Sequence, residues 1–248
     1  MDFSQITYYI LTAAAALIAL TIHEVSHGYV AYKLGDNTAM SLGRLSLNPL
    51  KHIDIYGVIC TVLFHFGWAK PVPINARNFK KPKRDFALTA LAGPASNLIL
   101  AFIMTAPFLL CLKLYLSLIT SSASGFVLSL LENTISFLST FVMINIGLGV
   151  FNLIPIPPFD GSRILNVILP ERIYFKIMKY EKKIYIGVVC WLLLGGYVYL
   201  ALMSVPFIAS SPVLSFIARF FSLSELLSGV NVFLLELIMD FWQLIIPI

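Results

Sequence analysis

The first long apolar stretch of the chain, Tyr8 to Leu34, carries His23, Glu24 and His27 in its interior. Only 12% of the 248 residues are charged, against roughly 25% in soluble domains, and the mean hydropathy is +0.89. These values indicate a membrane protein. An acidic or basic residue at the centre of a membrane helix costs about 2.5–3.5 kcal/mol. Three such groups in one span therefore indicate a function for them.

The apolar pattern predicts an all-α polytopic membrane protein with about five or six transmembrane helices, in a single domain over residues 1–248. After the first span, Gly35-Asp36 is a helix stop, and the next predicted helix covers 86–118, with breaks near "AGPAS" and at Pro107. Further helices are predicted over 127–153 and 184–207. The last apolar segment, 223–246, carries Glu225, Asn231, Glu236 and Asp240, so it either spans the membrane or lies in its interface.

Two segments between the first and second long helices do not read as spans. The apolar run Ile53 to Phe66 has only 14 residues, which predicts a re-entrant or interfacial hairpin. In the following "GWAKPVPINARNF", Pro71 and Pro73 argue against a helix and favour a short extended, β-like segment. The N–H groups of Val72 and Ile74 then lie on one edge of that segment, where they could pair with an extended substrate as an added strand.

The basic residues predict how the chain lies in the membrane. Of the 17 lysines and arginines, nine lie between residues 33 and 84 and six between 163 and 183. Two basic loops separated by apolar spans are typical of the cytoplasmic side of a multispanning cell-membrane protein, which places the N-terminus outside. The loops would contact anionic lipids of the bilayer, so the net charge of +5 does not require nucleic acid as a partner.

Residues 23–27, "HEVSH", form an HExxH pattern. Positions four apart lie on one helix face, so both imidazoles can bind one metal ion, and Glu24 is placed to act as a general base on water. A catalytic zinc usually takes three protein ligands. Asp160, in the turn after "IPIPP" and on the same side of the membrane, is a better third ligand than His52 or His65, which lie in the basic loop and the hairpin.

Two intramembrane amides have two possible roles each. Asn97 and Asn152 could hydrogen-bond neighbouring helices. Near a metal that cleaves peptides, they could instead hold the substrate backbone or a developing oxyanion.

Five motifs together resemble the site-2 protease family of intramembrane metalloproteases. They are "HEVSH" (23–27), "GRLSLNPLKHID" (43–54), "FGWAKPVPIN" (66–75), "AGPASN" (92–97) and "NLIPIPPFDG" (152–161). The resemblance implies one zinc ion per chain held by His23, His27 and Asp160, with Glu24 as general base and Asn152 close to the metal. It also implies that membrane proteins with a transmembrane helix are cut on the cytoplasmic side.

The resemblance covers about residues 8–170, which form the expected catalytic core, whereas the helices over 184–248 have no predicted role. The chain has no room for the PDZ or CBS domain of many relatives, so a short form is expected. Two other functions remain open from the sequence: a divalent-metal transporter with the same three residues as a transit site, and a catalytically silent scaffold that binds membrane helices.

Overall fold

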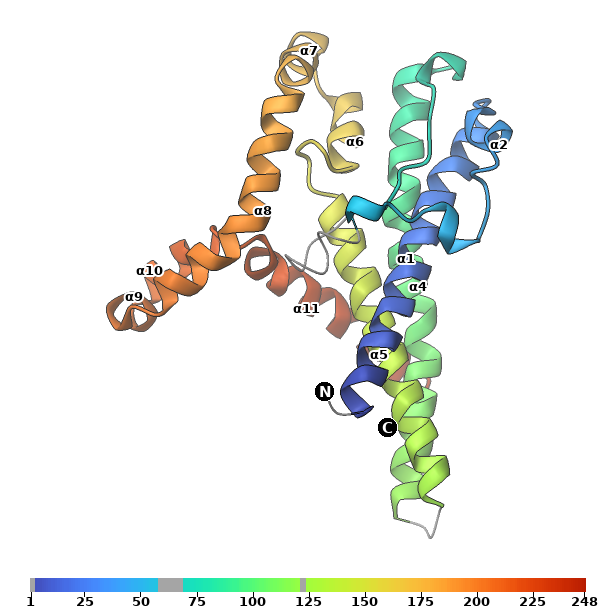
Figure 1. Cartoon of the computed structure of the whole chain (residues 1–248), viewed down its shortest axis with the longest axis vertical. Coiled ribbons are helices and arrows are strands. Elements are labelled where there is room, and N and C mark those ends of the chain that lie inside the picture. Colours follow the sequence, from blue (N-terminus) through green and yellow to red (C-terminus); the bar gives the residue numbers. More distant parts are fainter. Residues whose placement is uncertain (1–2, 58–68, 121–123) are drawn as a thin grey trace.

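The structure is a computed structural model that describes residues 3–57, 69–120 and 124–248. Three long helices lie side by side in it: α1 (Phe3–Lys33), α4 (Pro82–Ile119) and α5 (Gly125–Asn152) (Figure 1). All three are long and apolar enough to cross a membrane. The chain runs up α1, down α4 and up α5 in the view of Figure 1. The ends of α1 and α5 and the start of α4 therefore meet at the same end of the bundle.

Local sequence signals set the ends of these helices. α1 ends just before Gly35, whose φ of +109° is a backbone conformation that side chains with a Cβ rarely adopt. The N–H of Asp36 then donates to Ala31 O at 2.9 Å, which satisfies one of the last carbonyls of α1. At the start of α5, the hydroxyl of Ser124 accepts from the Val127 N–H, which is the N-cap contact that serines commonly provide.

The bundle is packed through small residues. Ala15 and Ala19 of α1 are fully buried against Phe141 of α5, and Ala101 of α4 is buried with Val142 and Ile146. Small side chains let membrane helices approach closely, and this closeness supplies the van der Waals contact that holds them together in lipid.

The remaining helices follow α5 in the order α6 (Gly161–Ile168), α7 (Glu171–Lys179), α8 (Glu181–Met203), α9 (Pro206–Ser210), α10 (Pro212–Arg219) and α11 (Leu223–Gln243). α8, α9 and α10 extend away from the three-helix bundle, whereas α11 returns to it (Figure 1). The indole Nε1 of Trp242 at the end of α11 donates to Phe102 O of α4 at 2.8 Å.

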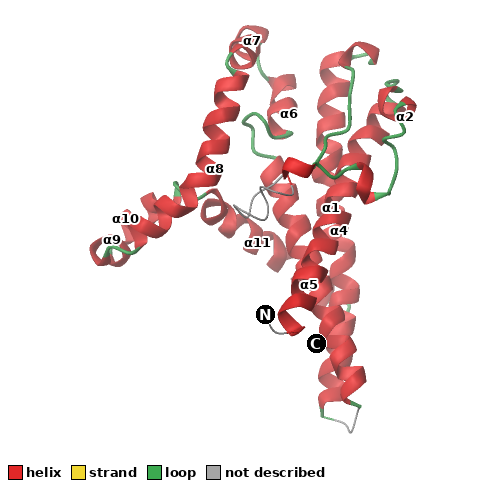
Figure 2. Cartoon of the chain, in the orientation of Figure 1, coloured by secondary structure: helices red, strands yellow, loops and turns green. Residues whose placement is uncertain are grey.

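The described part of the chain has three helices that meet the length and apolarity of a membrane span, or up to four if the two halves of α8, bent by 43°, form one span. This is fewer than the five or six expected. The all-α class is confirmed, since Figure 2 shows helices and loops and no strand among the described residues. α4 is one continuous helix that includes Pro94 and Pro107, so the expected breaks are wrong. Neighbouring helices and local adjustments make proline tolerable inside membrane helices.

Between α1 and α4, the described residues include the short helices α2 (Thr38–Ser41), η1 (Pro49–Lys51) and η2 (Ala76–Asn78). Ile53 and Ala69 form an isolated antiparallel bridge, and residues 70–75 have no regular secondary structure. Most of the predicted hairpin at Ile53 to Phe66 lies outside the described residues, so it stays a prediction.

Candidate metal centre

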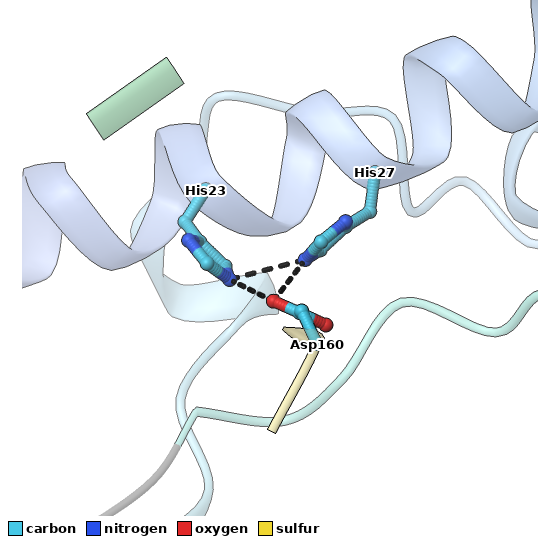
Figure 3. Close-up of side chains that lie close together, drawn as sticks. All are labelled: His23, His27 and Asp160. Atoms are coloured by element: carbon cyan, nitrogen blue, oxygen red, sulfur yellow. Dashed lines mark hydrogen bonds and ion pairs between the residues drawn. The ribbon is translucent and has the colours of Figure 1, made fainter. Parts of the chain in front are cut away.

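Three predicted ligands converge at one point (Figure 3). His23 and His27 project from the same face of α1 and are 4% and 6% exposed, and Asp160 reaches them from the turn before α6. The two Nε2 atoms are 3.0 Å apart, and each lies 3.2 Å from Asp160 Oδ2. Zinc bonds of about 2.0–2.1 Å at tetrahedral angles place ligand atoms roughly 3.3 Å apart. The three atoms are therefore spaced as ligands of a single ion.

The turn after α5 positions Asp160. Phe159 is buried and packs its ring edge-on against Phe151 of α5 at 4.4 Å between centroids. Gly161 follows, and a Cβ at that position would lie 2.5 Å from Ile154 O. The chain can turn back this tightly only with glycine there, which explains why the aspartate is followed by glycine at the start of α6.

The outer nitrogen of each imidazole is bound to a buried acceptor. His27 Nδ1 donates to Thr89 O of α4 at 2.7 Å, since a carbonyl can only accept. His23 Nδ1 lies 2.6 Å from Asn97 Oδ1. The Asn97 amide is oriented in turn by Asn145 of α5, since its Nδ2 donates to Asn145 Oδ1 at 2.8 Å.

The backbone of α5 fixes the direction of this chain of amides. Asn145 Nδ2 donates to Phe141 O at 2.8 Å, so Oδ1 of Asn145 faces Asn97 and Oδ1 of Asn97 faces His23. His23 Nδ1 must therefore be the donor. Both histidines carry their proton on Nδ1, and both Nε2 lone pairs point at the ligand position.

The convergence of three acceptors indicates a cation site. The two Nε2 atoms and the Asp160 oxygen lie within 3.2 Å of one another. With the imidazole protons on Nδ1, none of these three atoms has a proton to donate to the others. A metal ion fits this set, and two imidazoles with one carboxylate suit zinc.

Gly93 of α4 leaves the space in which the ligands meet. A Cβ added there would lie 2.5 Å from His27 Cε1 and 2.7 Å from His23 Cε1. Any larger residue would press against both rings. The "AGPASN" motif thus contributes a close approach at Gly93 and a ligand partner at Asn97.

Glu24 is held by the segment 70–75, which precedes η2. Its Oε2 accepts a hydrogen bond of 2.8 Å from the Val72 N–H, and Val72 itself is buried. One of the two N–H groups predicted to face a substrate therefore faces Glu24 in this structure. Ile74, two residues further on, lies in the same segment.

Asp36 ties this segment to the end of α1. The buried carboxylate accepts from the N–H of Asn75 and from Nδ2 of Asn78, both at 2.7 Å, and from the N–H of Thr38 at 3.1 Å. Burial raises the pKa of the Asp36 carboxyl, but a hydrogen bond from the Thr38 hydroxyl, together with those from Asn75, Asn78 and the Thr38 N–H, outweighs burial and holds the pKa below its ordinary value of 3.8. Sequence reasoning treated Asp36 only as part of a helix stop and missed this role.

The other described candidates have hydrogen-bond partners outside the three ligands. The Asn152 side chain donates to Leu148 O of its own helix at 3.0 Å. His52 Nε2 donates to Ser46 O at 2.8 Å, and His65 lies outside the described residues. Asn145 was also missed, although a lone asparagine inside an apolar span is a sequence signal in its own right.

Comparisons with known proteins agree with this geometry. Residues 11–196 match peptidase family M50. The chain is 39% identical over 178 residues to YwhC of Bacillus subtilis, a candidate zinc metalloprotease, and the match covers 72% of this chain and 76% of YwhC. A candidate zinc metalloprotease of Methanocaldococcus jannaschii is 30% identical over 173 residues, which cover 66% of this chain and 75% of that protein. The match to Rip2 of Mycolicibacterium smegmatis is 27% identical over 162 residues and spans 57% of Rip2. No solved structure gives a significant match.

Proposed function

Because the chain belongs to peptidase family M50, the site-2 protease family, we propose that it is an intramembrane zinc metalloprotease. It would hydrolyse peptide bonds in or next to transmembrane segments of membrane proteins. One observation carries this proposal: two histidines and an aspartate converge on one point inside a membrane helix bundle, beside a glutamate of the same helix.

His23, His27 and Asp160 would hold one zinc ion per chain through two Nε2 atoms and Oδ2. When bound, zinc would lower the pKa of a water molecule towards about 7 and polarise the substrate carbonyl. Glu24 would accept the proton of the attacking water and return it to the leaving amine. The hydrogen bond from Val72 to one oxygen of Glu24 would hold the carboxylate in place while the other oxygen moves the proton.

The two asparagines occupy different positions, so we assign them different roles. Asn97 is fully buried and bonded to His23, Ala19 O and Asn145, so it would position His23 rather than touch substrate. Asn152 remains the candidate for holding the substrate backbone or the oxyanion. Since Glu24 occupies the Val72 N–H, pairing with an added substrate strand would rest first on Ile74.

The proposed orientation puts the N-terminus outside the cell membrane and the metal centre towards the cytoplasm. Support comes from the basic residues that gather where α1 ends, where α4 begins and after α5. His27 lies six residues before Lys33, the last residue of α1, which is about 9 Å along the helix. Cleavage would then occur in the cytoplasmic half of the bilayer.

Replacing Glu24 by Gln tests the proposal against a transporter and a silent scaffold. The Gln side chain keeps the shape of Glu24 but cannot take up a proton, and none of the three ligands is changed. We expect zinc binding of the purified chain to persist while cleavage of a co-expressed membrane substrate disappears. Unchanged cleavage would refute the role of Glu24, and metal flux that persists in the variant would favour a transporter.

A further inference from the structure

A second polar site lies at the end of the bundle, apart from the metal centre. A cavity of about 260 Å³ opens between the end of α1 and the start of α4. Its lining residues are Lys33, Leu34, Gly35, Lys80, Lys81, Arg84 and Asp85. The histidines face the bundle interior, whereas the four cationic side chains around this cavity are exposed.

The charge of the cavity is strongly positive. Four cations and one acid give a formal net charge of 4 − 1 = +3. The acid is already engaged, because Asp85 accepts from the Lys81 N–H at 2.9 Å and from Arg84 Nε at 3.1 Å. Lys33, Lys80 and Lys81 therefore have no carboxylate of the cavity left to neutralise them. Such a site favours an anion.

The position of the cavity indicates which anion. Lys33 is the last residue of one candidate membrane span, and Pro82 is the first residue of another, so the cavity lies where the bundle leaves the hydrocarbon. The Lys33 ammonium lies 5.4 Å from the ring of the exposed Tyr29, and tyrosine is enriched at membrane interfaces. Cavities for drug-sized molecules start at about 300 Å³, so this one suits a single headgroup.

We propose that this cavity binds the phosphate of an anionic phospholipid headgroup. Lysines beside a membrane span attract anionic lipid, and here they come from two segments that are distant in sequence and converge on one hollow. The bound lipid would join the end of α1 to residues 80–85. It would thereby support the neighbouring Asp36, which fixes the segment that contacts Glu24.

Native mass spectrometry of the full chain in detergent tests this proposal, with added phosphatidylglycerol or phosphatidylcholine. The test variant is Lys80→Gln/Lys81→Gln. Lys182→Gln/Lys183→Gln is the control, because it removes the same charge from α8, outside the cavity. Each basic residue near a membrane contributes about 1 kcal/mol, so the test variant should bind phosphatidylglycerol roughly 30-fold more weakly. The control should bind it like the wild type, and phosphatidylcholine should bind weakly to all three.

A third variant and a folding control complete the experiment. Lys33→Gln should weaken phosphatidylglycerol binding about fivefold, which provides a second reading if the double variant does not fold. Zinc content equal to that of the wild type reports correct folding. Equal losses in the test and control variants would overturn the proposal, because the attraction would then be general. Displacement of phosphatidylglycerol by millimolar inorganic phosphate would also overturn it, in favour of a free-phosphate site.

Discussion

Replacing Gly93 by Ala should damage the metal centre although no ligand is substituted. The added Cβ would lie 2.5 Å from His27 Cε1 and 2.7 Å from His23 Cε1, whereas carbon atoms pack at about 3.5–4.0 Å. The rings or α4 must therefore move by about 1 Å. The Nδ1 bonds of the two rings, at 2.7 and 2.6 Å, would lengthen to roughly 3.6 Å, beyond the range of a hydrogen bond.

The size of the effect follows from those two bonds. Loss of the outer partner of a ligating histidine typically costs about 10–100-fold in metal affinity, and overpacking costs about 1–3 kcal/mol of stability. Zinc affinity of Gly93→Ala, measured by competition with a chromophoric chelator, should thus fall at least about tenfold. Gly147→Ala in α5 is the matched control, because a Cβ there meets nothing within 4 Å. If Gly93→Ala binds zinc as tightly as Gly147→Ala, the proposed convergence of ligands beside Gly93 is refuted.

Substitutions at four further positions test the contacts around the metal centre. Asn97→Ala should lower zinc affinity about 10–100-fold, and Asn145→Ala should lower it by less, both measured by chelator competition. Because both asparagines act on the same histidine, the loss of zinc affinity in the double variant should be smaller than the product of the two single losses. Val72→Pro removes the N–H that binds Glu24, so cleavage should fall with zinc binding retained, while Val72→Ala should cleave normally; equal rates would show that this hydrogen bond is dispensable. Asp36→Asn should lower the melting temperature at pH 7. Because the folded-state pKa of Asp36 lies below 3.8, the wild type keeps this stabilisation above that pH and loses it as the pH falls through the folded value, so the two melting temperatures should converge in acid.

Apolar length and helix-stop signals predicted the three helices of the bundle to within about five residues at each end. The expected five or six spans were an approximate count, and the described part of the chain has three such helices, or four if the two halves of α8, which are bent by 43°, form one span. Proline rules derived from soluble helices failed in α4, since they count the lost hydrogen bond and the ring clash but not the support of neighbouring helices.

Spacing and charge topology predicted that His23, His27 and Asp160 would share one side of the membrane, and the structure brings their ligand atoms together. The hydrogen bonds that hold the ligand histidines and Asp36 in place could not be predicted in this way. Whether Asn97 faces substrate or a histidine depends on how α4 rotates against α1, which the sequence alone does not define. Two partners of Asp36, Asn75 and Asn78, lie about 40 residues further along the chain, so no local pattern reveals them.

The hydrogen bonds of the buried amides set both the packing of the three helices and the orientation of the ligand His23. Asn97 of α4 binds α1 through His23 and Ala19 O, and α5 through Asn145. An unsatisfied polar group in lipid costs several kcal/mol, so the three helices are held in the register that satisfies all of these atoms. That register also turns Nε2 of His23 towards Asp160. Zinc bound at this point must then stabilise the bundle, because a ligand that binds only the folded state raises its stability. Substitutions that loosen the amide chain should weaken zinc binding even where they touch no ligand.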